Sequence, residues 1–201
     1  MIRKLKILIA ALVAALALGA AATATASAAY FHSEVVPTKI SGASTSAHVF
    51  SNATVNVTCQ QASFQGVMTA LTHEELTLVP EYSGCDMKVT GGVTTLGATV
   101  NLNGCDYRIF SYGRHEIACP AGKAMEFSIA GCTVTVIPQT DTVANTYTNK
   151  EKHIDVAFGP ELLLKTSGFL CGTTQGNGSY AGTATLSGKA WNGMPVKIWH
   201  E

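Results

Sequence analysis

The chain has 201 residues, with 13 basic and 13 acidic side chains and therefore no formal net charge. Outside the first six residues it contains no basic run. This argues against nucleic-acid binding, because that function requires a cationic surface. The length suits one domain, or at most two small ones.

The first 28 residues are predicted to be a cleaved secretion signal, with the usual order of a positive segment, an apolar run and a cleavage site. The apolar run covers about residues 7–22. A single membrane anchor is the alternative, but this run is rich in alanine, whereas a spanning helix needs roughly 20 strongly apolar residues. A lipid anchor is disfavoured because the first cysteine is Cys59. The positive residues are Arg3, Lys4 and Lys6, and the cleavage motif is Ala26-Ser27-Ala28.

Removal of this signal would leave about 173 residues with 10 basic and 13 acidic side chains, because the signal holds three basic residues and no acidic one. The resulting net charge of −3 argues against adhesion to anionic lipid. No second apolar run is long enough to span a membrane. We therefore expect an exported protein with no nucleic-acid partner and no membrane span after cleavage.

All six cysteines lie after the predicted signal. An even number of cysteines in an exported protein indicates three disulfides, and the count alone leaves the connectivity open. A metal site is the alternative, but no Cys-x-x-Cys pair occurs, and we expect neither a metal nor another cofactor. The cysteines are Cys59, Cys85, Cys105, Cys119, Cys132 and Cys171.

Short runs of alternating apolar and polar residues recur along the chain, separated by Gly, Pro and Asn at intervals of roughly 8–12 residues. No stretch after the signal sustains the spacing of an amphipathic helix. We therefore predict an all-β fold over residues 51–201, an antiparallel sandwich or barrel cross-linked by three disulfides. Residues 29–50 carry little pattern and are expected to be a partly mobile lead. The alternating runs are residues 55–58, 75–79, 99–102, 126–129, 133–137 and 183–186.

Three further features concern the organisation of the chain. The polar stretch over residues 138–152 is a candidate connection between two β subdomains. Asn177-Gly178 lies between two strand-like runs and predicts a two-residue hairpin. The dipeptide Gly-Cys occurs at Gly84, Gly104 and Gly131, each time before alternating polar and apolar residues. We interpret each glycine as the end of a turn and each cysteine as the start of a strand, and an internal repeat is the alternative.

One hairpin can be predicted residue by residue. Residues 111–113 have the form of a three-residue loop that ends with Gly113 at positive φ. Paired residues then have numbers that sum to 224, so that Arg108 faces Glu116 and Tyr107 faces Ile117. The face with Tyr107 is mainly apolar and suits the core, whereas the other face carries the opposite-charge pair.

The same register places Cys105 directly opposite Cys119, within the reach of a disulfide. We therefore predict a bond between these two cysteines. With that pair assigned, sequential connectivity is expected for the others. The remaining bonds would be Cys59–Cys85 and Cys132–Cys171.

No residue pattern marks a catalytic, cofactor or metal site, and we assign no residue to any of these roles. His73-Glu74-Glu75 and His115-Glu116 begin like a zinc-protease motif but lack its second histidine. His153 and Asp155 would lie on one side of a strand as two possible ligands. No nucleophile elbow or phosphate-binding loop occurs, and nothing marks Ser179, beside the predicted hairpin, as a nucleophile.

Aromatic residues are spread over several of the predicted strands. Packing in the core or at its rim is the simpler interpretation, because tyrosine and tryptophan suit a half-buried sheet face. A carbohydrate-stacking face is the functional alternative. The residues are Trp191, Trp199, Tyr180, Tyr147 and Tyr107.

Several short motifs occur in a particular order between Cys59 and about Tyr180. The most specific are Asn103-Gly104-Cys105-Asp106-Tyr107, then Cys119-Pro120, and finally the run from Asn177 to Gly182. In this order the chain resembles a family of exported, uncharacterised bacterial proteins that occur as paralogues in actinomycete-type genomes. The resemblance implies export, an all-β fold and paired cysteines, and it implies no activity.

The leading hypothesis is a secreted or cell-envelope-associated binding or structural module, with a cell-envelope component or a glycan as a possible ligand. A small extracellular hydrolase acting on glycans is the alternative, and it would need two carboxylates about 5–10 Å apart in one cleft. A third hypothesis is an eight-stranded outer-membrane barrel. Six cysteines and runs shorter than the required 9–11 residues or so argue against it.

Overall fold

The computed structural model describes residues 29–92, 95–140 and 145–201. The predicted signal, residues 1–28, lies outside these ranges. Within them the chain forms β-strands and no helix, and every strand pair is antiparallel, which confirms the predicted fold class. The described part therefore contains no helix long and apolar enough to cross a membrane.

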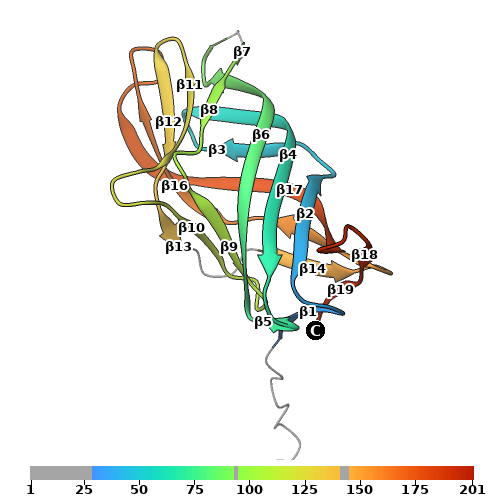
Figure 1. Cartoon of the computed structure of the whole chain (residues 1–201). Helices are drawn as coiled ribbons and strands as arrows, with labels where there is room; N and C mark the ends of the chain where they lie inside the picture. Colours follow the sequence, from blue (N-terminus) through green and yellow to red (C-terminus); the bar gives the residue numbers. More distant parts are fainter. Residues whose placement is uncertain (1–28, 93–94, 141–144) are drawn as a thin grey trace, which may run out of the picture.

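The strands of the described ranges form a three-stranded sheet, β19-β1-β5, and a large sheet of sixteen strands (Figure 1). The small sheet lies at one end of the molecule, beside the C-terminus. In chain order the strands are β1 (Phe31–Ser33), β2 (Thr38–Ser44), β3 (His48–Ser51), β4 (Val55–Met68), β5 (Thr72–His73), β6 (Glu75–Val89), β7 (Thr95–Gly97), β8 (Thr99–Asn101), β9 (Asp106–Phe110), β10 (His115–Ala118), β11 (Met125–Ile129), β12 (Cys132–Val136), β13 (Gln139–Thr140), β14 (Asn145–Asn149), β15 (His153–Phe158), β16 (Glu161–Ser167), β17 (Thr174–Ala190), β18 (Pro195–Val196) and β19 (Ile198–His200).

Three long, curved strands organise the large sheet. β4 has 14 residues, β6 has 15 and β17 has 17, so these strands are longer than the short runs visible in the sequence. Each of them changes partners along its length. β17, for example, pairs with β16 and β3 in its first half and with β15, β2 and β18 in its second half.

The segment that contains β7 and β8 closes the large sheet at one end. β7 pairs with β6, and β8 pairs with β11. Between the two strands, the Ala98 N–H donates to the Cys85 carbonyl at 2.7 Å. Backbone pairing thus runs from β6 through β4, β3, β17, β16, β12 and β11 to β8, and β7 returns it to β6.

The core fills the inside of this rolled sheet. Alternate residues of each strand face inward, as the alternating sequence pattern predicts. Aromatic rings dominate this interior, and Phe50 stacks on Tyr180 with ring centroids 4.5 Å apart. A histidine, His48, is fully buried among these rings. The largest buried aromatic side chains are Tyr107, Tyr180, Phe31, Phe50, Phe64 and Phe127.

The predicted hairpin between Cys105 and Cys119 is confirmed in register. Tyr107 pairs with Ile117, and Arg108 pairs with Glu116 with their charged groups 3.5 Å apart. Gly113 has a φ of 92°, as its place at the end of the loop requires. The predicted connectivity is also confirmed, because the three disulfides are Cys59–Cys85, Cys105–Cys119 and Cys132–Cys171.

Two of the expected boundaries are absent from the described structure. Residues 29–50, expected to be a partly mobile lead, contain β1, β2 and most of β3, and β2 pairs with both β4 and β17. The stretch 138–152 does not separate two units, because β12 before it pairs with β16 after it. The lead lacks a clear alternating pattern because serine, threonine and alanine occupy many of its strand positions.

The predicted hairpin at Asn177-Gly178 is wrong. Both residues lie inside β17, where they pair with Leu163 and Leu162. A Cβ atom on Gly178 would lie 2.4 Å from the Ser51 carbonyl oxygen. Gly178 is therefore needed because neighbouring atoms approach its backbone closely. The sequence alone does not distinguish a glycine in this role from a glycine in a turn.

The interpretation of the Gly-Cys dipeptides holds for two of the three. Gly104 and Gly131 have positive φ and precede the strands β9 and β12. Gly84 also has positive φ, at 60°, but it lies in the middle of β6. There the pairing of β6 with β4 skips Gly84 and resumes with Cys85 opposite Cys59.

Candidate functional site

One edge of β6 is left without a strand partner over part of its length. β6 pairs with β9 through residues 75–78 and with β7 through residues 86–88. Between these two contacts, no strand in the described part of the chain pairs with this edge. The sheet is therefore open along about residues 79–84 of β6, although it is closed at both ends of this gap.

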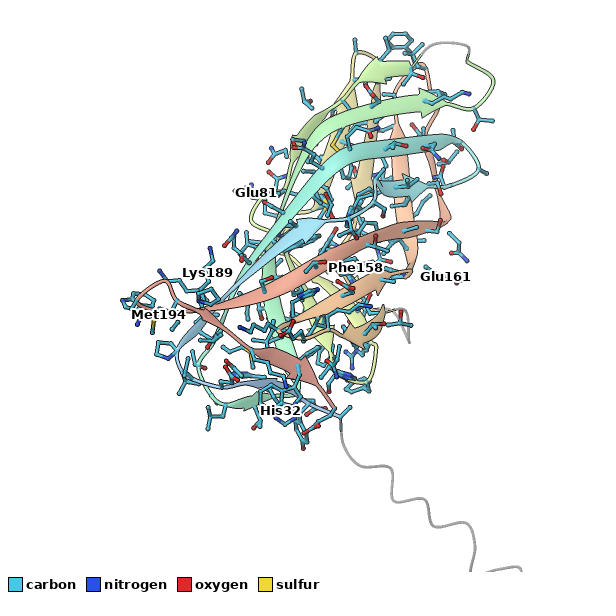
Figure 2. The ribbon with its side chains drawn as sticks, turned by 90° about the vertical axis from the view of Figure 1, so that its right-hand side faces the viewer. His32, Glu81, Phe158, Glu161, Lys189 and Met194 are labelled. Atoms are coloured by element: carbon cyan, nitrogen blue, oxygen red, sulfur yellow. A yellow bond between two sulfur atoms is a disulfide. The ribbon has the colours of Figure 1, made fainter. Side chains whose placement is uncertain are left out.

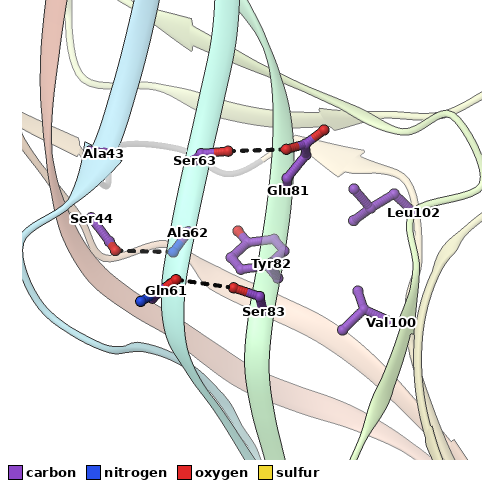
Figure 3. Close-up of a pocket in the computed structure, with 10 residues that line it drawn as sticks. All are labelled: Ala43, Ser44, Gln61, Ala62, Ser63, Glu81, Tyr82, Ser83, Val100 and Leu102. Atoms are coloured by element: carbon purple, nitrogen blue, oxygen red, sulfur yellow. Dashed lines mark hydrogen bonds between the residues drawn. The ribbon is translucent and has the colours of Figure 1, made fainter.

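A pocket of about 630 Å³ lies at this gap (Figure 3). Val100 and Leu102, from β8 and the residues after it, lie across the gap from Tyr82. The other side is formed by neighbouring residues of β2, β4 and β6. The lining residues are Ala43, Ser44, Gln61, Ala62, Ser63, Glu81, Tyr82, Ser83, Val100 and Leu102.

The polar lining comes from cross-strand pairs of β4 and β6. Ser63 faces Glu81, and its hydroxyl donates to the Glu81 carboxylate at 3.2 Å. Gln61 faces Ser83, whose hydroxyl donates to the Gln61 side-chain oxygen at 3.4 Å. These groups keep further hydrogen-bonding capacity, since a carboxylate accepts several bonds and an amide has both donors and an acceptor. The pocket therefore presents both hydrogen-bond donors and acceptors.

Tyr82 connects this pocket to the core. Its ring is partly exposed at the pocket, whereas its hydroxyl lies 2.7 Å from the Tyr107 hydroxyl and 3.0 Å from the Tyr180 hydroxyl. The chain of bonds continues from the Tyr180 hydroxyl to His48 Nδ1, at 2.6 Å, and from His48 Nε2 to the Thr183 carbonyl, at 3.3 Å.

The carbonyl at the end of this chain determines the direction of every bond. A carbonyl only accepts, so His48 Nε2 carries the proton and Nδ1 accepts from the Tyr180 hydroxyl. Tyr180 then accepts from Tyr82, and Tyr82 accepts from Tyr107, because each hydroxyl has a single proton to donate. Each of the three hydroxyl protons thus has an acceptor inside the core.

Burial keeps these four groups uncharged at neutral pH. It lowers the pKa of His48 from 6.5 to about 4, and the bond to the Thr183 carbonyl offsets only part of this shift. Burial also raises the pKa of Tyr82, Tyr107 and Tyr180 above the ordinary value for tyrosine. The network therefore fixes the ring of Tyr82 at the pocket without placing a charge below it.

His153 and Asp155, the candidate ligand pair, lie in a second, shallower depression of about 410 Å³. His153 Nε2 is 3.6 Å from the Asp155 carboxylate, which also accepts from the Thr185 hydroxyl at 2.7 Å. The other carboxylate oxygen is 3.8 Å from Lys150 Nζ. The described residues contain no group of three or more side chains able to hold a metal ion.

The other candidates from the sequence lie apart from the pocket at the β6 gap. His73 Nε2 accepts the backbone N–H groups of Thr69 and Ala70, and thus stabilises the turn before β5. His115 is buried on β10 and its Nδ1 lies 3.3 Å from the side chain of Asn145. Ser179 lies inside β17 rather than at a hairpin tip.

The five aromatic residues considered for a carbohydrate-stacking face do not form one surface. Tyr107 and Tyr180 are in the core, whereas Trp191 is exposed in the loop after β17. The aromatic ring at the pocket is that of Tyr82, which is not one of these five candidates. Its position could have been inferred, because Leu76, Leu78 and Tyr82 are even-numbered positions of one alternating strand and all face inward.

None of the four depressions found in the described residues is lined by more than one carboxylate, Glu81 in the first and Asp155 in the second. The paired carboxylates that a glycan hydrolase would need in one cleft are therefore not brought together in these depressions.

Comparison with models of protein families, with curated proteins and with solved structures finds no significant match. The resemblance to the exported bacterial family therefore stays a prediction. Three disulfides are consistent with an extracytoplasmic protein, because such bonds persist in oxidising compartments.

Proposed function

We propose that the protein is a secreted or cell-envelope-associated binding module whose ligand site is the pocket at the β6 gap. The single observation that carries this proposal is the interruption of strand pairing along β6, which leaves a pocket between β6 and β8. Concave sites with a few convergent polar groups are the usual places for ligands. The predicted signal and the disulfides support export.

A neutral glycan is the ligand class that suits this lining. The hydroxyl groups, the Gln61 amide and the Glu81 carboxylate are partners for sugar hydroxyls, and the lining includes no basic side chain for an anion. The ring of Tyr82 and the side chains of Val100 and Leu102 are partners for the apolar C–H surfaces of a sugar.

The scaffold favours binding because the residues that line the pocket are ordered before a ligand binds. The hydroxyl of Tyr82 is bonded on both sides, and Cys59–Cys85 links β4 to β6 next to the pocket. A site that is already ordered loses little conformational entropy when it binds.

The test is a binding screen of neutral oligosaccharides on the oxidised protein, followed by calorimetry on matched variants. Gln61→Ala removes a lining amide and should weaken binding about tenfold, the effect of losing one or two hydrogen bonds. Gln65→Ala, an exposed glutamine four residues further along β4 and outside the pocket, is the control and should leave affinity unchanged. Equal affinities for the two variants would contradict the proposed site.

A further inference from the structure

Two loops form a projecting corner that shares no lining residue with the pocket at the β6 gap. The loop of residues 34–37 joins β1 to β2, and the hairpin loop of residues 191–194 joins β17 to β18. Both loops line one shallow depression of about 440 Å³. Figure 2 shows Lys189 and Met194 where this corner extends away from the rolled sheet.

The corner exposes large apolar side chains. Trp191 is 68% exposed and Met194 is 60% exposed, and Val35 and Val36 of the other loop are exposed beside them. Single exposed apolar residues are common on protein surfaces, but a contiguous group at a projecting tip is typical of an interaction site.

Three lysines flank these two loops in the sequence. Lys39 and Lys189 face each other directly in the ladder of β2 and β17, an arrangement that is unfavourable between like charges. Lys39 Nζ lies 4.1 Å from the centre of the Trp191 ring. Lys197 follows β18, and its backbone N–H donates to the carboxylate of Glu34 at 3.0 Å.

The two loops and their flanking residues, 34–39 and 189–197, hold three lysines and one carboxylate, that of Glu34. None of the salt bridges among the described residues involves Lys39, Lys189 or Lys197. The carboxylate in the first loop, Glu34, is engaged by a backbone N–H group. Lys197 Nζ lies 5.3 Å from the centre of the Trp199 ring, so the lysines beside the apolar tip are Lys39 and Lys189. A partner of complementary chemistry carries negative charge above an apolar layer.

We infer that this corner docks the protein onto a membrane surface that contains anionic lipid. Tryptophan and aliphatic side chains at a tip can enter the interfacial layer, where tryptophan is enriched in membrane proteins. Lysine side chains pack their methylene groups along apolar surface and keep their ammonium groups at the level of the headgroups. Anionic headgroups attract such basic clusters.

The net charge of −3 expected for the processed chain does not decide this question. Net charge describes the molecule as a whole, whereas a membrane surface interacts mainly with charges within about 10 Å, the screening length in moderate salt. The fold brings Lys39 and Lys189 together at this corner from separate parts of the chain.

A membrane surface fits this corner better than a protein partner does. Stable protein interfaces involve about 20–30 residues on each side. The corner offers two short loops on a projection, which can enter a lipid layer but present little flat area for a second protein. Weak docking through such loops is expected, because a peripheral contact of this size is reversible.

The test is sedimentation of the oxidised protein with vesicles of equal parts phosphatidylcholine and phosphatidylglycerol, and with vesicles of pure phosphatidylcholine. We expect binding to the mixed vesicles that is at least tenfold tighter than to the neutral ones and that weakens in 0.5 M salt or thereabouts. Failure to bind the mixed vesicles, or equal binding to both, would overturn the inference.

Matched variants locate the contact. Trp191→Ser with Met194→Ser should reduce binding to mixed vesicles at least tenfold, and so should Lys39→Gln with Lys189→Gln. Phe169→Ser removes a side chain that is 85% exposed and lies outside both loops, and should leave binding unchanged. Thermal melts establish that each variant is folded. If the Phe169 variant loses binding while the corner variants keep it, the inference is wrong.

Two further measurements distinguish the membrane contact from the glycan site and from a protein interface. Gln61→Ala should bind mixed vesicles normally, so failure of the glycan site and failure of the membrane contact are distinguishable. Sedimentation equilibrium tests for a second copy at the corner. Self-association that is abolished by Trp191→Ser with Met194→Ser, without vesicle binding, would assign the corner to a protein partner and overturn the lipid assignment.

Discussion

The hydroxyl oxygens of Tyr82 and Tyr107 lie 2.7 Å apart inside the core, although the residues are 25 positions apart in the chain. Tyr82 is also the aromatic residue of the pocket at the β6 gap. A bond deep in the core therefore fixes the orientation of a side chain that a ligand would contact, and stability and binding are linked through one residue.

Replacing Tyr82 with phenylalanine should destabilise the fold by about 1–3 kcal/mol. The substitution keeps the ring but removes the acceptor of the Tyr107 hydroxyl, and a buried donor without a partner costs about this much. Urea denaturation measures the change. Tyr112→Phe, at an exposed tyrosine, is the control and should change the free energy of unfolding by less than about 0.5 kcal/mol. Equal effects in both variants would contradict the proposed network.

Stability should fall as the pH drops from about 6.5 to about 4. The pKa of His48 is 6.5 in the unfolded chain and about 4 in the fold, so in this interval the unfolded state binds more protons than the folded state. The difference corresponds to a loss of about 3 kcal/mol, complete near the lower pKa. Titration of the His48 ring by NMR checks this directly. A folded-state pKa near 6.5 would show that the ring is not buried as described.

Removal of single disulfides should destabilise the protein in the order of their loop lengths. Cys105–Cys119 closes a separation of 14 residues and Cys132–Cys171 closes one of 39. Loop-closure entropy then predicts losses of about 3 kcal/mol and about 4 kcal/mol for the corresponding double alanine variants. Urea melts measure the losses. A protein whose melting is unaffected by strong reductant would contradict a stabilising role for these bonds.

Gly178→Ala should destabilise the fold by about 2 kcal/mol or more, because its Cβ would lie 2.4 Å from the Ser51 carbonyl oxygen and 2.7 Å from Leu164 Cδ1. Gly176→Ala is the matched control on the same strand, since nothing lies within 4 Å of its added Cβ. If position 178 were instead in a turn that needs positive φ, deuterium exchange would find its neighbours unprotected rather than hydrogen-bonded to β16.

The alternating pattern and one loop predicted much of this fold. The hairpin over residues 105–119 can be predicted from the sequence because Gly113 ends a loop of fixed length. The loop length determines every residue pair in the hairpin. The disulfides followed because that register places Cys105 opposite Cys119. These are local relationships, in which each residue's partner is nearby in the chain.

Contacts between residues far apart in the chain cannot be predicted from the sequence in the same way. The pocket exists because β6 changes partner from β9 to β7, and the sequence of β6 does not state where its neighbours begin and end. Gly178 shows a second limit, since glycine serves both turns and close packing. The lead over residues 29–50 shows a third, because strands rich in serine and threonine lack a strong apolar alternation.

The central claim, that the pocket at the β6 gap binds a neutral glycan, is tested most directly by NMR. Neutral oligosaccharides that bind in the screen are titrated into isotope-labelled, oxidised protein, and the backbone amide shifts are mapped. We expect the largest shifts at Gln61, Glu81, Ser83 and Leu102, around the ring of Tyr82. Shifts confined to the depression around His153 and Asp155, or no shifts with any oligosaccharide, would contradict it.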